Sequence, residues 1–546
     1  MTKIPSGIPI GKCCVFILAA TIVALALRLP QLRQRPMHGD EAVLAIMFGQ
    51  LLEEGVYTYN PDRYHGPTLT YITLIPTRLA SARKLTEVDE FLLRIVPVLF
   101  GLSLVLLLLL LVDGLGPIAA VFAAVLTAVS PAMAFYSRYY IMEILLVCFT
   151  FGVIACGYRY TQNKKIVWII LAGIFAGLMH ATKETCIIAF GSMLLALSIV
   201  LLMQYKKNSF TNVFKSIKPL HIISSLAAAA IVSALFYSSF LSNPGGIWDS
   251  LRAYTTYFAR AGGETIHIHP WYYYLKMLIF FRYADGPIWT EAVIVLLAVI
   301  GFIAIVRKKY PSSANINLLR FIAFYTLIMT IIYSAISYKT PWCMLSFLHG
   351  MILLAGVGAV ALVKLMPRVL PRLIILLLLI DACGYLLWQS YQGNYIYYAD
   401  SRNPYVYAHP TTEVFTVADK IEQYARINKD GHDMHIQVIC PDNDYWPLPW
   451  YLRSFTKIEW RDKVATNVPP APLIIASDKV EQALTDKLYS QTPLEERQMY
   501  MFIFDKPYYV WLRPKVKLLG FVRKDLWESM RQNQIKIIPA NTEDKE

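Results

Sequence analysis

Long apolar runs dominate the first part of the chain. The first covers residues 13–29, and a more polar stretch, residues 30–90, follows it. Further apolar runs cover residues 91–112, 115–134, 143–160, 166–182, 185–204, 218–240, 286–306, 318–337, 341–363 and 369–390. Runs of about 18 or more apolar residues indicate membrane spans rather than core helices. The pattern predicts a multi-span α-helical membrane domain, residues 1–390, with about 11 transmembrane helices.

The pattern becomes more polar and alternating after residue 390. Strands are predicted at residues 433–440, 456–461, 472–477 and 500–504, with helices at 412–429 and 480–488. Strands alternating with helices are typical of an α/β domain, so residues 391–546 are expected to form a separate soluble α/β domain. The loop 441–451 is dense in acids and aromatics, which suits either carbohydrate contact or packing.

Charge supports a membrane protein rather than a nucleic-acid partner. Only 16% of residues are charged, whereas a soluble domain carries about 25%. The net charge of +14 would favour nucleic-acid binding in a soluble protein, but here Lys and Arg gather in short loops between the predicted spans. The positive-inside rule then predicts an inner (cytoplasmic) membrane protein with a cytoplasmic N-terminus and an extracytoplasmic C-terminal domain, with the lipid bilayer as a partner.

Several classes of site find no support in the sequence. The eight cysteines show no CxxC pair and no Cys/His metal spacing, so we predict neither a disulfide framework nor a metal site. A divalent cation as cofactor is left open. We find no phosphate-binding loop, Rossmann fingerprint or nucleophile elbow, which argues against an ATP-driven transporter or a nicotinamide enzyme.

The adjacent acids Asp40 and Glu41 follow the first span and open a helical pattern. One interpretation is a helix N-cap, for which Asp is favoured. The other is catalysis, because desolvation at a membrane edge would raise a carboxylate's pKa and suit it to act as a base. The two roles are compatible. The following segment contains Tyr64 and His65 among residue types that bind sugars and phosphates, so both are candidate substrate-binding residues.

Four further ionisable residues fall on the same predicted outer face. Arg138 and Glu143 flank the start of the span 143–160. Arg138 would bind a phosphate with two donors, or else extend to the interface beside Glu143. Lys183 and Glu184 occupy a very short connection between two spans, where ionisable residues are costly and therefore indicate a site. The alternative is an ion pair at the start of the next helix.

Two outer segments add aromatic and basic groups. His267 and His269 would share one face of a strand, which raises a metal site, but no nearby Cys or Asp completes a ligand set. Substrate lining or an interfacial role is preferred. Tyr338, Lys339 and Trp342 interrupt the chain between two spans. Lys339 would contact a phosphate there, and the alternative is an aromatic belt with an extended lysine.

A first span ending in a long outer loop with an Asp-Glu pair resembles the GT-C superfamily of membrane glycosyltransferases. This superfamily includes protein O-mannosyltransferases and the aminoarabinose and RgtA-like transferases. Residues 38–71, HGDEAVLAIMFGQLLEEGVYTYNPDRYHGPTLTY, are similar to the opening signature of the family named "flippase activity-associated". Residues 136–143 and 337–342 resemble later motifs of that family.

The resemblance implies a reaction and roles for the candidates. A carboxylate deprotonates an acceptor hydroxyl, which attacks the anomeric carbon of a polyprenyl-phosphate-linked sugar with inversion, and polyprenyl phosphate leaves. The acceptor is a lipid, glycan or protein. Asp40 matches the catalytic base, Glu41 would orient the acceptor or a cation, and Glu143 matches a second acid. The phosphate would be held by Arg138, Lys183 and Lys339.

Two rival interpretations stay open. One is a transporter or flippase-associated protein that handles a lipid-linked sugar without breaking its bond. The other is a structural subunit of an envelope-assembly complex. Asp40 discriminates among them, because only transfer chemistry requires a base at this position.

Overall fold

In a computed structural model, the chain divides into two compact units. The structure describes residues 10–62, 65–205, 218–261, 267–310, 313–465 and 467–537. Tyr64 lies outside the described residues. The helical unit comprises Met1–Leu32, Gln50–Arg83 and Val88–Tyr407. The C-terminal unit comprises Arg33–Gly49, Lys84–Glu87 and Ala408–Glu546. The segment that carries Asp40 and Glu41 thus belongs by its contacts to the C-terminal unit.

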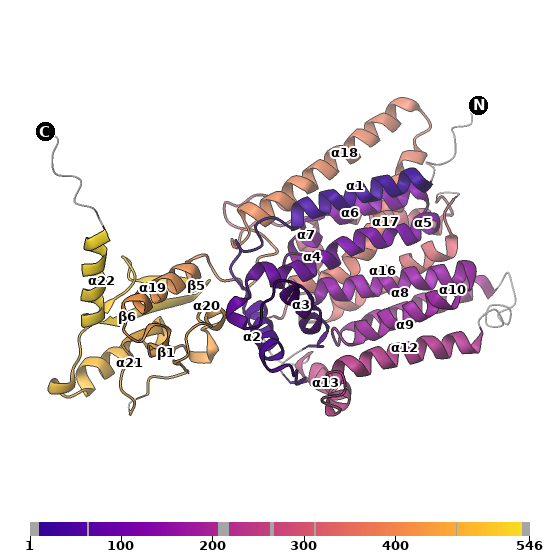
Figure 1. The fold of residues 1–546 in the computed structure, drawn as a ribbon. Helices are drawn as coiled ribbons and strands as arrows, with labels where there is room; N and C mark the ends of the chain where they lie inside the picture. Colours follow the sequence, from indigo (N-terminus) through magenta and orange to yellow (C-terminus); the bar gives the residue numbers. More distant parts are fainter. Residues whose placement is uncertain are drawn as a thin grey trace. The chain divides into compact units, whose positions relative to one another are not determined.

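Long apolar helices build the helical unit (Figure 1). Among the described residues, eight are long and apolar enough to cross a membrane. They are α1 (Ile10–Arg28), α4 (Glu90–Leu107), α8 (Glu143–Asn163), α10 (Cys186–Tyr205), α12 (Pro219–Tyr237), α16 (Ile316–Ala335), α17 (Leu345–Leu365) and α18 (Val369–Tyr391). Three shorter apolar helices are α6 (Pro117–Val129), α9 (Ile166–His180) and α15 (Ala292–Val306). Each lies on a predicted apolar run, which confirms the multi-span helical fold; the number of spans stays a prediction.

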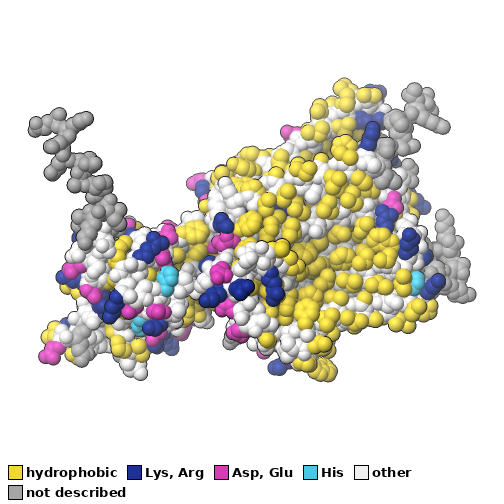
Figure 2. All heavy atoms as spheres, in the orientation of Figure 1, with side chains coloured by type: hydrophobic (Ala, Val, Ile, Leu, Met, Phe, Trp, Pro, Cys, Tyr) yellow, Lys and Arg dark blue, Asp and Glu magenta, His cyan; other side chains and the backbone are white. Residues whose placement is uncertain are grey.

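The surface of this unit explains why it belongs in lipid. Figure 2 shows apolar side chains over a broad area of the helical bundle. Leu226 of α12 and Ile380 of α18 are 65% and 67% exposed. Large apolar side chains exposed over such an area are unfavourable in water and favourable against lipid tails. The spanning segments are helical because a helix satisfies its backbone hydrogen bonds internally.

Small residues allow the helices of the bundle to approach closely. A methyl group added at Gly358 of α17 would lie 1.9 Å from the carbonyl oxygen of Leu297 in α15. One added at Gly173 of α9 would lie 2.2 Å from the carbonyl oxygen of Ser225 in α12. Such contacts replace the hydrophobic driving force that is missing between helices in lipid. Shorter helices of the helical unit are α3 (Thr68–Leu79), α5 (Val112–Leu115), α7 (Pro131–Tyr136), α13 (Gly245–Ala261) and α14 (Tyr273–Ile279). The helix α2 (Gly39–Glu54) is divided between the two units after Gly49.

A mixed sheet organises the C-terminal unit. Its strands are β1 (Ile436–Ile439), β2 (Ile458–Arg461), β3 (Leu473–Ser477), β4 (Tyr500–Phe502), β5 (Tyr509–Arg513) and β6 (Val516–Arg523). The order is β2-β1-β3-β6-β4, with β5 also paired to β6. β1 is parallel to β2 and β3, whereas β6 is antiparallel to β3, β4 and β5. The helices are α19 (Glu413–Ile427), α20 (Leu448–Tyr451), α21 (Glu481–Thr485) and α22 (Lys524–Ile537).

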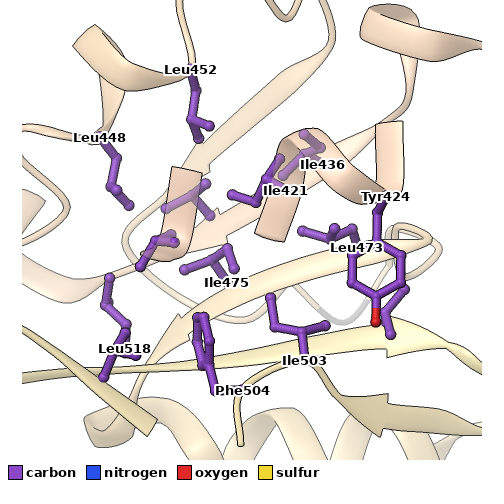
Figure 3. Packing of buried hydrophobic residues seen from close by; sticks show 14 of the residues in the cluster. Ile421, Tyr424, Ile436, Leu448, Leu452, Leu473, Ile475, Ile503, Phe504 and Leu518 are labelled. Carbon is purple, nitrogen blue, oxygen red and sulfur yellow. The ribbon is translucent and has the colours of Figure 1, made fainter. Parts of the chain in front are cut away.

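Alternating side chains of the sheet supply two apolar cores, one on each face. Leu473 and Ile475 of β3 pack in the same core as Ile421 of α19 (Figure 3). Ile474, between them, belongs to the other core with Leu484 of α21. Successive residues of a strand point to opposite faces, so a strand buried on both faces is apolar throughout. The unit is therefore an α/β domain, as predicted.

The prediction of this unit was correct for its first half and incomplete for its second. The helix α19 and the strands β1 to β4 lie at predicted positions. β5, β6 and α22 were missed. The turn between β5 and β6 consists of Pro514 and Lys515, with Lys515 at φ +71°, and lacks the Asn-Gly or Asp-Gly signal that marks many tight hairpins. The aromatic and β-branched residues of Tyr509–Arg513 were the available sequence signal, and their burial alternates in the structure.

Candidate active site

The two adjacent acids at the start of α2 have different surroundings. The side chain of Glu41 is fully buried, and its Oε2 accepts a hydrogen bond from the backbone N–H of His38 at 3.0 Å. Its Oε1 lies 3.8 Å from Nη2 of Arg35. The side chain of Asp40 is 57% exposed. Glu41 therefore holds the start of the helix and the guanidinium of Arg35 in place, while the Asp40 carboxylate is accessible from solvent.

His38 lies at the N-cap position of α2, where the sequence suggested Asp40. The backbone N–H of Asp40 donates to Nδ1 of the His38 ring at 3.0 Å, and the helix already begins at Gly39. The Asp40 carboxylate is thus not the N-cap, and it is available for another role. The sequence predicted that both acids would lose hydration at the membrane edge, but only Glu41 is buried. The ring of His38 in turn lies 4.9 Å from that of His409.

His65 and Glu184 meet in the helical unit. Nδ1 of His65 lies 2.6 Å from Oε2 of Glu184, and the hydroxyl of Tyr59 donates to Oε1 at 3.2 Å. The backbone N–H of Thr68 donates to the carbonyl oxygen of Ala181 at 3.2 Å. The loop after α2 is therefore held on the turn between α9 and α10, and two residues predicted separately belong to one cluster.

The charge of Glu184 makes the stability of this cluster dependent on pH. Burial acts to raise its pKa, but the attraction and hydrogen bond of His65, with the nearby Lys183, bring the pKa below its ordinary value. A carboxylate with a lowered pKa stabilises the fold above its unfolded-state pKa, about 4.3, and this contribution disappears as the pH falls through the folded-state pKa.

We therefore expect wild type to unfold at a higher temperature than Glu184→Gln near neutral pH, with the difference shrinking below about pH 4.3. Thermal unfolding of the detergent-solubilised protein across pH would measure it. Glu481→Gln, at an exposed position on α21, is the control and should show no such trend. A difference between wild type and Glu184→Gln that stays constant with pH would contradict the assignment.

Gly66 permits the contact between this loop and the turn. A methyl group added there would lie 2.2 Å from the carbonyl oxygen of Ala181, closer than any tolerated contact. We expect Gly66→Ala to lower the free energy of unfolding by about 1–3 kcal/mol, because the backbones must separate. Gly191→Ala is the matched control, since nothing lies within 4 Å of the added methyl group there. Equal thermal stability of the two variants would contradict this interpretation.

Lys183 and Glu143 form a buried ion pair. Nζ of Lys183 donates to Oε1 of Glu143 at 2.5 Å, and both side chains are almost completely buried. Glu143 is the first residue of α8, and Lys183 lies in the turn between α9 and α10. The structure thus pairs two residues from separate segments that the sequence had assigned different roles. Their roles as second acid and phosphate ligand stay predictions.

Arg138 follows α7 and contacts the end of α1. Its Nη1 donates to the carbonyl oxygens of Pro30 at 2.7 Å and Arg28 at 3.1 Å, and to the hydroxyl of Tyr395 at 3.0 Å. Its Nη2 donates to the carbonyl oxygen of Gln31 at 3.3 Å. A helix C-terminus carries partial negative charge, which a guanidinium stabilises. These donors thus contact protein oxygens here, and the phosphate role of Arg138 stays a prediction.

The two histidines of the His-x-His segment face the same way. Nδ1 of His267 and Nε2 of His269 lie 2.8 and 3.4 Å from the hydroxyl of Tyr407. Between them, Ile268 forms an antiparallel bridge with Tyr338. The extended geometry expected from the sequence is therefore present. No group of three or more His, Cys, Asp or Glu residues with metal-binding geometry occurs in the described part of the chain.

Lys339 and Trp342 connect this segment to the motif around Arg138. The backbone N–H of Lys339 donates to the carbonyl oxygen of His267 at 2.9 Å, and its Nζ donates to that of His269 at 3.1 Å. The ring of Trp342 lies 6.2 and 5.9 Å from those of Tyr136 and Tyr139. The second and third motifs of the sequence resemblance thus form one aromatic cluster.

Residues that sequence reasoning missed complete these clusters. Glu291, directly before α15, is fully buried and accepts hydrogen bonds from the Ser130 hydroxyl at 2.5 Å, the Ala132 N–H at 2.9 Å and the Tyr405 hydroxyl at 2.7 Å. It links α7, α15 and the segment after α18. An acid at the start of an apolar run was the available signal. Tyr395 and Tyr407 carried no local signal.

Comparisons with known proteins agree with this architecture. Residues 65–237 match the family described as dolichyl-phosphate-mannose-protein mannosyltransferase, a range that does not include Asp40 or Glu41. No curated protein matches the sequence.

Solved structures of similar fold include two that contain a lipid phosphate. ArnT from Cupriavidus metallidurans bound to undecaprenyl phosphate is 13% identical, with a TM-score of 0.61 over 94% of this chain and 98% of that chain. The oligosaccharyltransferase AglB from Archaeoglobus fulgidus, in complex with an inhibitory peptide and a dolichol-phosphate, is 12% identical, with a TM-score of 0.51 over 95% of this chain and 77% of that chain.

The protein is a multi-span membrane protein that shares its fold with these two structures and has a C-terminal α/β domain. The family model covers about a third of the chain, and the likeness to the two solved structures shows a shared fold.

Proposed function

We propose that the protein transfers a sugar from a polyprenyl-phosphate-linked donor to an extracytoplasmic acceptor. The observation that carries this proposal is the exposed Asp40 carboxylate beside the buried Glu41, on a chain with the GT-C fold. The lipid phosphates named for ArnT and AglB support the class of donor. The N-terminus would lie in the cytoplasm, with residues 1–390 in the membrane and residues 391–546 forming an extracytoplasmic domain.

Asp40 acts as the general base in this proposal. Its carboxylate takes the proton of the acceptor hydroxyl as that oxygen attacks the anomeric carbon. The bond from the anomeric carbon to the phosphate oxygen breaks, polyprenyl phosphate leaves with the bonding electrons, and the sugar configuration inverts. Glu41 supports this geometry, because its hydrogen bond to His38 and its proximity to Arg35 fix the first turn of α2.

Cations stabilise the charge that develops on the leaving phosphate. We assign this role to Arg138, Lys183 and Lys339. Each contacts protein oxygens in the structure, so the lipid phosphate must replace one of these contacts or bind beside it. Glu143 would then release Lys183 to the phosphate, and His65 would shape the acceptor side.

Release of polyprenyl phosphate by the purified protein tests this proposal. The full-length protein in liposomes would receive a panel of undecaprenyl-phosphate sugars together with envelope lipids, glycans and hydroxyl-bearing peptides. We expect release coupled to appearance of a glycosylated acceptor and lost in Asp40→Asn. Tight donor binding without release across the panel would instead support a transporter of lipid-linked sugars. Absence of both binding and release would favour a structural subunit.

A further inference from the structure

Part of the C-terminal α/β domain lies directly against the segment that carries Asp40. The backbone N–H of Met37 donates to the hydroxyl of Tyr451 at 2.8 Å. A methyl group added at Gly39 would lie 3.7 Å from Cβ of Trp446, which is van der Waals contact. Both partners come from the aromatic loop, defined as residues 445–451 after β1. The residue next to the exposed carboxylate therefore faces Trp446.

The aromatic loop is held rigidly from its own domain. Nη1 of Arg513 in β5 donates to the carbonyl oxygen of Trp446 at 3.1 Å, and its Nη2 donates to Asp444. Asp444 also accepts from Lys479 at 3.1 Å. The ring of Tyr445 packs at 4.7 Å on that of Trp460 in β2. Trp446 is thus a partly exposed aromatic side chain on a fixed support, as a preorganised binding surface requires.

We infer that Trp446 is the platform on which a saccharide acceptor binds, with one of its hydroxyls presented to Asp40. This inference rests on the proposed function and names its acceptor class. A sugar ring has an apolar face that packs on an aromatic ring and an edge of hydroxyls that bind polar groups. Trp446 supplies the aromatic ring for the apolar face of the sugar. Asp40 follows Gly39, which contacts Trp446, and its carboxylate supplies a proton acceptor for a hydroxyl of the sugar.

The surroundings of Trp446 favour a saccharide over the two other acceptor classes. Asp442, Asn443 and Asp444 immediately precede the aromatic pair, and such polar groups suit hydroxyls rather than an acyl chain. A peptide often binds by adding a strand to an open sheet edge. β1, which leads into the aromatic loop, already pairs with β2 on one side and β3 on the other. β1 therefore has no open edge for a peptide, and the open edge beside it belongs to β2, a strand of only four residues.

Direct binding tests this inference without requiring turnover. Saturation-transfer NMR would use the full-length protein in detergent and a panel of di- and trisaccharides of mannose, glucose, galactose and N-acetylglucosamine. We expect saturation transfer from wild type, and a dissociation constant about tenfold larger for Trp446→Ala, which corresponds to about 1.4 kcal/mol. Trp446→Phe should restore part of the affinity because it keeps an aromatic face.

Trp511→Ala is the matched control, since Trp511 is a partly exposed tryptophan of the same domain that contacts Lys517. It should bind the saccharides like wild type. Equal binding by Trp446→Ala and Trp511→Ala overturns the inference, and so does a panel that gives no binding to wild type.

Transfer kinetics separate this inference from the proposed function. With undecaprenyl-phosphate sugars as donors, Trp446→Ala should raise the KM for saccharide acceptors about tenfold, whereas Trp511→Ala leaves it within about twofold. Wild-type transfer to peptides or lipids but not to saccharides would overturn the inference and leave the transferase standing. Saccharide binding that depends on Trp446, without any release of polyprenyl phosphate, would overturn the transferase and leave the saccharide site.

Discussion

Replacing Asp40 with Asn should lower release of polyprenyl phosphate about 10²- to 10⁴-fold, the usual contribution of a general base. The amide keeps the size of the side chain and loses the ability to take a proton. Asp40 is 57% exposed and does not cap α2, so its replacement should leave folding intact. Single-turnover release from a preloaded lipid-linked sugar would measure the effect directly.

Three controls give this result its meaning. Glu54→Gln, at an exposed position on the same helix, should release at the wild-type rate. Thermal unfolding and donor binding of Asp40→Asn should match those of wild type. Release by Asp40→Asn within about tenfold of wild type would exclude Asp40 as the base, because a general base contributes more than that.

Replacing Lys183 with Met should destabilise the helical unit by about 3–5 kcal/mol, as removal of one partner of a buried ion pair commonly does. The Glu143 carboxylate would remain buried after losing its 2.5 Å contact, and its Oε2 has no hydrogen-bond partner among the described residues. Glu143→Gln should also destabilise. The double variant should be more stable than Lys183→Met, because it removes both charges.

A double-mutant cycle on thermal unfolding measures this coupling, and donor binding by the same variants tests the phosphate role. A phosphate ligand at Lys183 predicts weak donor binding whenever Lys183 is replaced, including in the stable double variant. Donor binding in the double variant equal to wild type would restrict Lys183 to a structural role. Additive effects on stability would show that the ion pair seen here is not formed in the membrane.

The spanning helices could be predicted because their signal is local. The run 218–240 is mostly apolar, and α12 (Pro219–Tyr237) occupies it. A segment of that length and composition has few alternatives to crossing a membrane as a helix. The strands β5 and β6 required another kind of information. They depend on a two-residue turn without a strong sequence signal and on pairing of β6 with β3 across the intervening chain.

The residue types at the candidate site were also readable from the chain, but their relations were not. The sequence identified Glu143, Lys183 and Glu184 because ionisable groups are costly near a membrane, and His65 because its segment is rich in residue types that bind sugars and phosphates. It did not indicate that Lys183 pairs with Glu143 while Glu184 pairs with His65. Each pairing depends on which helix ends pack together, and single-sequence spacing carries no information on that.

The sequence by itself therefore determined a multi-span membrane protein with a C-terminal α/β domain, and it identified the Asp-Glu pair as the main candidate site. Only the tertiary structure decided that Glu41 is buried beside Arg35, that Asp40 is exposed, and that Trp446 lies against Gly39. The physical reason is the range of the interactions. Hydrophobic runs act through neighbouring residues, whereas burial and contact depend on segments about 400 residues apart that meet only when the chain is folded.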